Sequence, residues 1–191
     1  DHRRSIDSFL SLLDRKTVQT ESGQRQLQLY HFSETEGELL KEVVHTLLLA
    51  FDEFGGPPQM VTYFSEKGHR DYEEYLYRTL VDLYISQERF IEATTALETF
   101  MKTYPFHEDA PSLMASLIEI QTKRKKVSLV VQAKEDFIQT FGAGSPWSKQ
   151  VTDLARLKIE PALKETEDEL VLHYYAQAQK SKRKEGYEKA I

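Results

Sequence analysis

The sequence predicts an all-α protein built from a row of short helical hairpins. The prediction rests on a pair of apolar stripes at helical spacing over residues 75–105, and on degenerate copies of that pair before and after it. Glycine and proline residues separate the copies. A hairpin of this size cannot bury its apolar face alone, so we expect the copies to stack on one another.

Residues 75–105 hold the best-preserved hairpin. Each of its two helices has an apolar stripe, and the polar residues 86–88 lie between them. The stripe residues are Tyr77, Leu80, Val81, Tyr84, Phe90, Ala93, Leu97 and Phe100. Pro105 ends the second helix, because proline has no backbone donor and clashes with the preceding turn. The small Ala93 marks a close approach of the two helices.

Two degenerate copies flank this hairpin. A shift of 33 residues towards the N-terminus places apolar residues on six stripe positions, namely Val44, Leu47, Leu48, Phe51, Met60 and Phe64. A shift of 37 residues towards the C-terminus aligns Phe137 with Phe100 and Ala133 with Ala96, and we expect the extra residues in the turn near 122–126. Gly55 and Gly56 end a helix of the first copy, and Gly142 takes the place of the closing proline in the second.

The two ends of the chain depart from the hairpin pattern. Residues 1–16 predict an amphipathic helix, and residues 17–32 predict a short β-hairpin or an extended linker, of which we favour the linker. Ser145 and Pro146 are typical of a helix start. The expected divisions are 1–32, an N-terminal helix with a linker or partial repeat; 33–70, a degenerate hairpin; 71–107, the best hairpin; 108–144, a degenerate hairpin; 145–169, a long helix broken at Pro161; and 170–191, the start of a truncated further hairpin.

The spacing of these residues resembles that of the tetratricopeptide repeat (TPR), a helix–turn–helix unit of 34 residues. The stripe residues from Tyr77 to Phe100 and the closing Pro105 take signature positions in register. Val81 and Phe100 are larger than the residues usual at their positions. The resemblance implies a right-handed superhelical stack of hairpins, in which the first helix of each unit lines a concave groove that receives a partner peptide.

Carried over position by position, the resemblance implies a set of groove-facing residues. They are Tyr75, Arg78, Asp82, Ile85 and Ser86 in the best repeat, Glu42, His45, Leu49, Asp52 and Glu53 in the preceding unit, and Ser112, Glu119, Thr122 and Lys123 in the following unit. This polar mixture of both charge signs suits an extended or charged peptide better than an apolar helix. The two-carboxylate clamp of chaperone-binding TPR proteins is not formed by this sequence.

Composition and motifs favour a binding protein over an enzyme. The chain has no cysteine, no HExxH motif and no glycine-rich phosphate loop, so we expect no catalytic residues, no cofactor and no metal. The net charge of −6 argues against general nucleic-acid binding. No apolar run has the roughly 20 residues that span a bilayer. Two basic runs, 123–126 and 180–184, are interpreted as helix C-termini, where cations complement the helix dipole.

The resulting hypothesis is a non-enzymatic scaffold that binds a partner protein or peptide. The alternative is a structural spacer or self-association segment of a larger protein, and a homodimer is compatible with either. The ending F-x-x-x-Y/F-P/G is similar to that of TPR proteins of the bacterial envelope, such as outer-membrane assembly lipoproteins and Tol–Pal coordinators. That resemblance implies a periplasmic location, with the cytoplasm as the alternative. Both ends of the chain look cut, as in a fragment.

Overall fold

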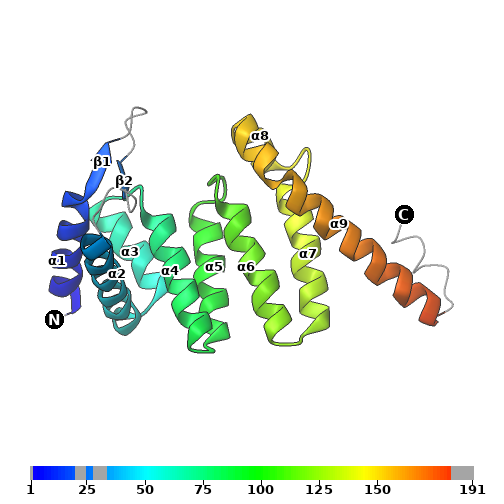
Figure 1. The fold of residues 1–191 in the computed structure, drawn as a ribbon, viewed down its shortest axis with the longest axis horizontal. Coiled ribbons are helices and arrows are strands. Elements are labelled where there is room, and N and C mark those ends of the chain that lie inside the picture. The colour runs from blue at the N-terminus through cyan, green and yellow to red at the C-terminus, as the bar shows by residue number, and fades with distance from the viewer. Residues whose placement is uncertain (1, 20–24, 28–33, 182–191) are drawn as a thin grey trace. The chain divides into compact units, whose positions relative to one another are not determined.

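The computed structural model describes residues 2–19, 25–27 and 34–181, and these form two compact units, residues 1–103 and 104–191. Each unit is a set of α-helices packed against their neighbours, with one short strand pair in the first (Figure 1). The all-α prediction is confirmed at this level. The predicted features at residues 20–24, 28–33 and 182–191 lie outside the described residues.

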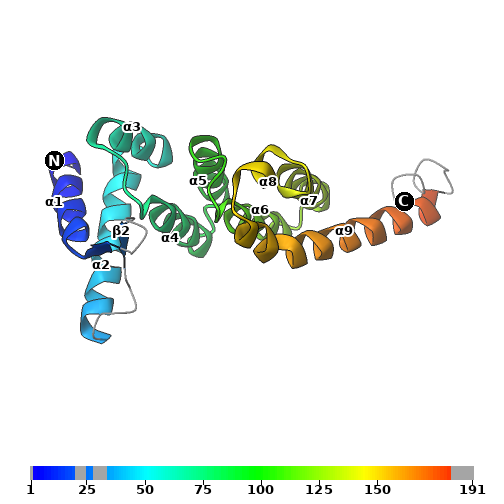
Figure 2. The same ribbon diagram turned by 90° about the horizontal axis from the view of Figure 1, so that it is seen from above.

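Unit 1 consists of an N-terminal helix, a short strand pair and two stacked helical hairpins. Its elements are α1 (His2–Arg15), β1 (Thr17–Gln19), β2 (Arg25–Leu27), α2 (Glu34–Phe54), α3 (Pro57–Lys67), α4 (Glu73–Ser86) and α5 (Phe90–Thr103). Helices α2 and α3 form one hairpin, and α4 and α5 form the next. Helix α1 packs on α2, α2 lies against α4, and α3 lies against α5 (Figures 1 and 2). Equivalent helices of successive hairpins are therefore neighbours.

The core of unit 1 is made by the stripe residues that the sequence predicts. Tyr77, Leu80, Val81, Tyr84, Ala93, Leu97 and Phe100, and their counterparts Val44, Leu47, Leu48, Phe51, Met60 and Phe64, are each at most 2% exposed. Phe90, the remaining predicted stripe residue, lies at the first position of α5 and is only partly buried. The Phe51 ring lies 5.5 Å from Tyr63 and 5.8 Å from Phe64, between ring centroids. These edge-on and tilted contacts are favourable aromatic geometries. The predicted burial of the six stripe residues on α2 and α3 is thus confirmed.

The connection after α1 contains a strand pair, which corrects the preference for a linker. Strands β1 and β2 are antiparallel, with Thr17 opposite Leu27 and Gln19 opposite Arg25. The periodicity of two was a weak signal because each strand has only three residues. The structure favours the β-hairpin that the sequence left as the alternative.

Unit 2 begins with a hairpin that has the same construction as α4–α5. Helices α6 (Ala110–Lys123) and α7 (Val127–Phe141) are joined by residues 124–126, just as α4 and α5 are joined by 87–89. Lys125 and Glu88 take the same place in these turns, and both have a left-handed backbone, with φ of 54° and 58°. The α6–α7 hairpin is therefore offset from the α4–α5 hairpin by 37 residues both before and after the turn. The residues that exceed the 34-residue repeat lie in the connection between the two hairpins, at 104–109. The predicted insertion near 122–126 is wrong.

The chain after α7 bends earlier than the sequence predicts. Helix α8 (Pro146–Gln150) is followed by α9 (Asp153–Ser181), and the break lies at Val151 and Thr152. The Thr152 hydroxyl accepts a hydrogen bond from the Ala155 amide at 3.2 Å, which caps α9. Ser145 caps α8, as expected, by accepting a bond from the Ser148 amide.

Helix α9 continues through Pro161, so the predicted break at that residue does not occur, and the helix is also continuous across the expected division between residues 169 and 170. A proline inside a helix removes one backbone hydrogen bond and crowds the carbonyl of the residue four positions earlier. That residue is Leu157, whose side chain is 63% exposed, and Pro161 is exposed as well. Water can hydrate the carbonyl on this side, so the helix tolerates the proline.

One polar atom inside unit 1 leads to a stability prediction. Among the described residues, the Tyr77 hydroxyl is a buried side-chain group without a hydrogen-bond partner. Burial raises the Tyr77 pKa above its ordinary value, and the Glu73 charge adds to the effect. Because an unpaired buried hydroxyl is destabilising, Tyr77→Phe should raise the free energy of unfolding by up to about 1 kcal/mol. Urea unfolding followed by circular dichroism measures the change, and a clear loss of stability would show that the hydroxyl is satisfied.

Candidate binding face and the side chains that support it

The five residues predicted for the groove in the best repeat occupy one face of α4. At 100° per residue, Tyr75, Arg78, Asp82, Ile85 and Ser86 fall within roughly a third of the helix circumference, opposite the buried stripe. Asp82 and Ser86 are exposed, and the other three are partly exposed. The Arg78 Nε atom donates to Glu74 Oε1 at 2.8 Å, one turn away. Helix α4 therefore has a polar, partly exposed face opposite its buried stripe.

The outward face of the neighbouring helix α2 is formed in the same way. Glu42, His45 and Glu53 are exposed, and Leu49 is 38% exposed. The fifth predicted residue, Asp52, is partly buried and is held by two other side chains. Because α2 lies against α4, the predicted residues of these two helices belong to one side of unit 1. We refer to the outward residues of α2 and α4 together as the α2–α4 face.

Asp52 links α2 to the α4–α5 hairpin. It accepts hydrogen bonds from Arg89 at 2.6 and 3.0 Å and from the Tyr84 hydroxyl at 2.7 Å. The Arg89 guanidinium also lies 4.5 Å from the centre of the Tyr84 ring and donates to Glu92 at 3.0 Å. Such a charge-assisted network fixes geometry as well as adding energy. It sets the register between two successive hairpins at the edge of the α2–α4 face.

The bond to Arg89 makes the stability of unit 1 depend on pH. The hydrogen bond from Arg89 lowers the Asp52 pKa below its ordinary value. Burial acts in the opposite direction, and the hydrogen bond from Tyr84 lowers the pKa further. The folded form then binds protons more weakly than the unfolded form, so this stabilisation is present above the unfolded pKa of about 3.9 and is lost as the pH falls through the folded pKa. Urea midpoints should therefore fall less between pH 7 and pH 3 for Asp52→Asn than for the unmodified chain. Equal falls would contradict this.

The α6 residues predicted for the groove form a similar face within unit 2. Ser112, Glu119, Thr122 and Lys123 are all exposed and lie on the side of α6 away from its buried residues. Lys123 Nζ lies 2.8 Å from Glu119 Oε1, one turn away. The predicted residues of α6 thus lie on the outward side of their own helix, as do those of α4 and those of α2 other than the partly buried Asp52.

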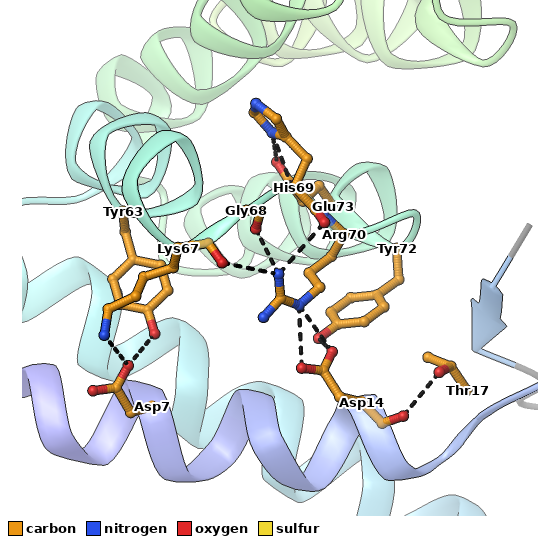
Figure 3. Close-up of polar contacts among 10 residues, drawn as sticks. All are labelled: Asp7, Asp14, Thr17, Tyr63, Lys67, Gly68, His69, Arg70, Tyr72 and Glu73. Carbon is orange, nitrogen blue, oxygen red and sulfur yellow. Dashed lines mark hydrogen bonds and ion pairs between the residues drawn. The ribbon is translucent and has the colours of Figure 1, made fainter.

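A polar cluster that the sequence analysis missed attaches α1 to the α3–α4 connection (Figure 3). Asp14 on α1 accepts hydrogen bonds from Arg70 Nε at 3.0 and 3.1 Å and from the Tyr72 hydroxyl at 2.7 Å. Two helical turns earlier on α1, Asp7 accepts a hydrogen bond from the Tyr63 hydroxyl. Its Oδ1 atom also lies 3.5 Å from Lys67 Nζ. That bond from Tyr63 lowers the Asp7 pKa below its ordinary value. These partners are more than 50 residues apart in the sequence, so no local sequence pattern predicts that they interact.

The same connection contains a buried carboxylate. Glu73 is 3% exposed; its Oε1 accepts from the Arg70 amide at 2.5 Å and lies 3.3 Å from His69 Nδ1. The Arg70 guanidinium donates to the Gly68 carbonyl at 2.6 Å. Glu73 thereby satisfies a backbone amide of the loop that leads into α4, as an acidic residue in a first helical turn commonly does. The arrangement fixes the start of the helix that presents the outward face.

Only part of the first basic run fits its interpretation as a helix C-terminus. Lys123 ends α6 and Arg124 caps it, whereas Lys125 lies in the turn and Lys126 precedes α7. A cation at a helix N-terminus gains nothing from the helix dipole. The second run, 180–184, is described only at its first two residues.

The part of the chain that the structure describes has no group of three or more His, Asp or Glu side chains placed to hold a metal ion. None of its helices combines the length and apolar character needed to cross a bilayer. Comparison with protein-family models, with curated proteins and with solved structures found no match.

Proposed function

We propose that the chain is a non-enzymatic scaffold of the TPR type that binds an extended segment of a partner protein on the α2–α4 face. The observation that carries the proposal is the separation of roles on α2 and α4. In both helices the apolar side is used for packing, and the opposite side is polar, accessible and fixed in register by the Asp52–Arg89–Tyr84 network. A rigid polar surface of this kind suits recognition of a peptide backbone and charged side chains.

The charge of the α2–α4 face suggests the chemistry of the segment. Carboxylates outnumber cations among its described residues, with Glu42, Glu53 and Asp82 exposed and Arg78 held near Glu74. A surface with an excess of negative charge attracts basic segments and speeds their association. We therefore propose a lysine- or arginine-rich extended segment as the partner. The similarity of the repeat ending to bacterial envelope TPR proteins supports a periplasmic setting as part of the same proposal.

Fluorescence anisotropy with a labelled lysine-rich peptide tests the proposal, with a glutamate-rich peptide of equal length as the reference. The Glu42→Gln, Asp82→Asn double variant should weaken binding of the lysine-rich peptide several-fold, because two attractive charges leave the face. The matched control is Glu66→Gln with Glu98→Gln, which removes two exposed carboxylates from α3 and α5 instead. Equal weakening by both variants, or no binding at all, contradicts the proposed face.

A further inference from the structure

Among the described residues, helix α9 has one apolar side that packs on α7 and a second that is exposed. Ala155, Thr166 and Leu170 are buried on the side that packs on α7. On a helical projection the roughly opposite side carries the exposed residues Leu154 (65%), Leu157 (63%), Leu172 (67%) and Tyr175 (48%). Helix α9 has 29 residues against 15 in α7, and Figures 1 and 2 both show it extending past α7. The exposed side is therefore accessible along the length of unit 2.

Two apolar pairs lie near the ends of this exposed side. Leu154 and Leu157 are three residues apart, and so are Leu172 and Tyr175. The midpoint between the two pairs falls between Lys164 and Glu165, and Val171, which is 44% exposed, lies on the same side. In an isologous dimer, a two-fold axis at this midpoint brings the first pair of one copy onto the second pair of the other.

The charges of α9 determine the direction of pairing. Its first half, residues 153–164, carries three cations and two carboxylates, whereas residues 165–176 carry four carboxylates and no lysine or arginine. Parallel pairing would place the two acidic halves together. Antiparallel pairing places each acidic half beside the more basic half of the other copy, and it also opposes the two helix dipoles.

We propose that the exposed side of α9 binds a second copy of this chain, with the two α9 helices antiparallel across a two-fold axis between Lys164 and Glu165. Leu157 then packs on Leu172 of the second copy, and Leu154 packs on its Tyr175. Lys164 lies within about one helical turn of Asp168 of the second copy. The proposal uses a surface separate from the α2–α4 face and does not depend on peptide binding.

Sedimentation equilibrium of the 191-residue chain over a wide concentration range tests the pairing. We expect a reversible monomer–dimer equilibrium, which Leu157→Glu or Leu172→Glu should weaken about ten-fold or more, because each places a charge inside an apolar part of the contact. Ile91→Glu on α5 is the control, since Ile91 is 71% exposed but lies outside α9. A chain that stays monomeric, or a dimer unaffected by Leu172→Glu, overturns the proposal.

Cysteine cross-linking tests the register, because the natural chain has no cysteine. The double variant Leu157→Cys, Leu172→Cys should form a covalent dimer on oxidation. An intramolecular bond is excluded, since 15 residues of helix separate the two positions by roughly 22 Å. Neither single variant should cross-link, because in the antiparallel register each position lies far from the same position in the second copy. Efficient cross-linking of Leu157→Cys alone would indicate a parallel pair and overturn the proposal.

Charge exchange gives a second, independent readout. Lys164→Asp should weaken the dimer, because it places like charges near the axis, and Lys164→Asp combined with Asp168→Lys should restore it. Both residues are exposed, so neither variant should alter folding. Failure of the double exchange to recover dimerisation, in chains whose circular dichroism is unchanged, counts against the antiparallel arrangement.

Discussion

Replacing Trp147 with alanine is expected to lower the free energy of unfolding of unit 2 by about 3–5 kcal/mol, the usual cost of removing a large buried aromatic side chain. Trp147 is 1% exposed, and its ring lies 5.2 Å from that of Phe141, which in turn lies 5.2 Å from Phe137. Its indole Nε1 donates to the His107 carbonyl at 2.9 Å. The residue thus holds α8, α7 and the segment before α6 together.

The measurement is urea unfolding followed by far-ultraviolet circular dichroism. Trp147→Phe is the matched control: it keeps most of the ring contacts and loses the hydrogen bond, so its loss of stability should be clearly smaller. A loss below about 1 kcal/mol for Trp147→Ala would contradict the buried position.

Replacing Phe51 with alanine is expected to destabilise unit 1 by a similar amount, about 3–5 kcal/mol. Phe51 is fully buried on α2 and contacts the rings of Tyr63 and Phe64 on α3. It also occupies the position that Tyr84 takes in the next hairpin, so the substitution removes the aromatic anchor of one repeat.

The single tryptophan of the chain makes the effect on each unit measurable. Trp147 lies in unit 2, so its fluorescence follows that unit, while circular dichroism follows both. After Phe51→Ala, the loss of circular dichroism should begin at a lower urea concentration than in the unmodified chain. The unfolding curve of Phe51→Leu, which keeps an apolar side chain, should lie between those of the unmodified chain and Phe51→Ala. An unchanged unfolding curve would show that Phe51 does not anchor the hairpin.

Local patterns predicted the helices of the fold well. The stripe from Tyr77 to Phe100 identified both faces of α4 and α5, because helical periodicity directly records which side of a helix is buried. Gly55, Gly56 and Pro57 located the boundary between α2 and α3 to the residue. The candidate groove residues of α2, α4 and α6 came instead from the resemblance to the tetratricopeptide repeat, and the structure shows only that they lie opposite the buried stripes of their own helices.

The prediction was less successful where distant contacts decide the structure. The break before α9 arises because Trp147 packs on Phe141, while Thr152 caps a new helix. The break expected at Pro161 ignored the fact that an exposed helix side tolerates proline. Asp52 was assigned to the groove, but Arg89, 37 residues later, holds its carboxylate. Such pairs depend on how hairpins stack, and single-helix periodicity carries no information about them.

The central claim is that the α2–α4 face of unit 1 is the binding surface of this chain, and amide chemical-shift mapping by nuclear magnetic resonance tests it most directly. Titration of the isotope-labelled chain with the lysine-rich peptide should move the amide signals of outward α2 and α4 residues, among them Glu42, Arg78 and Asp82. Signals from the exposed sides of α3 and α5 should stay in place. Shifts confined to α3 and α5, or spread evenly over the whole surface, would contradict the account.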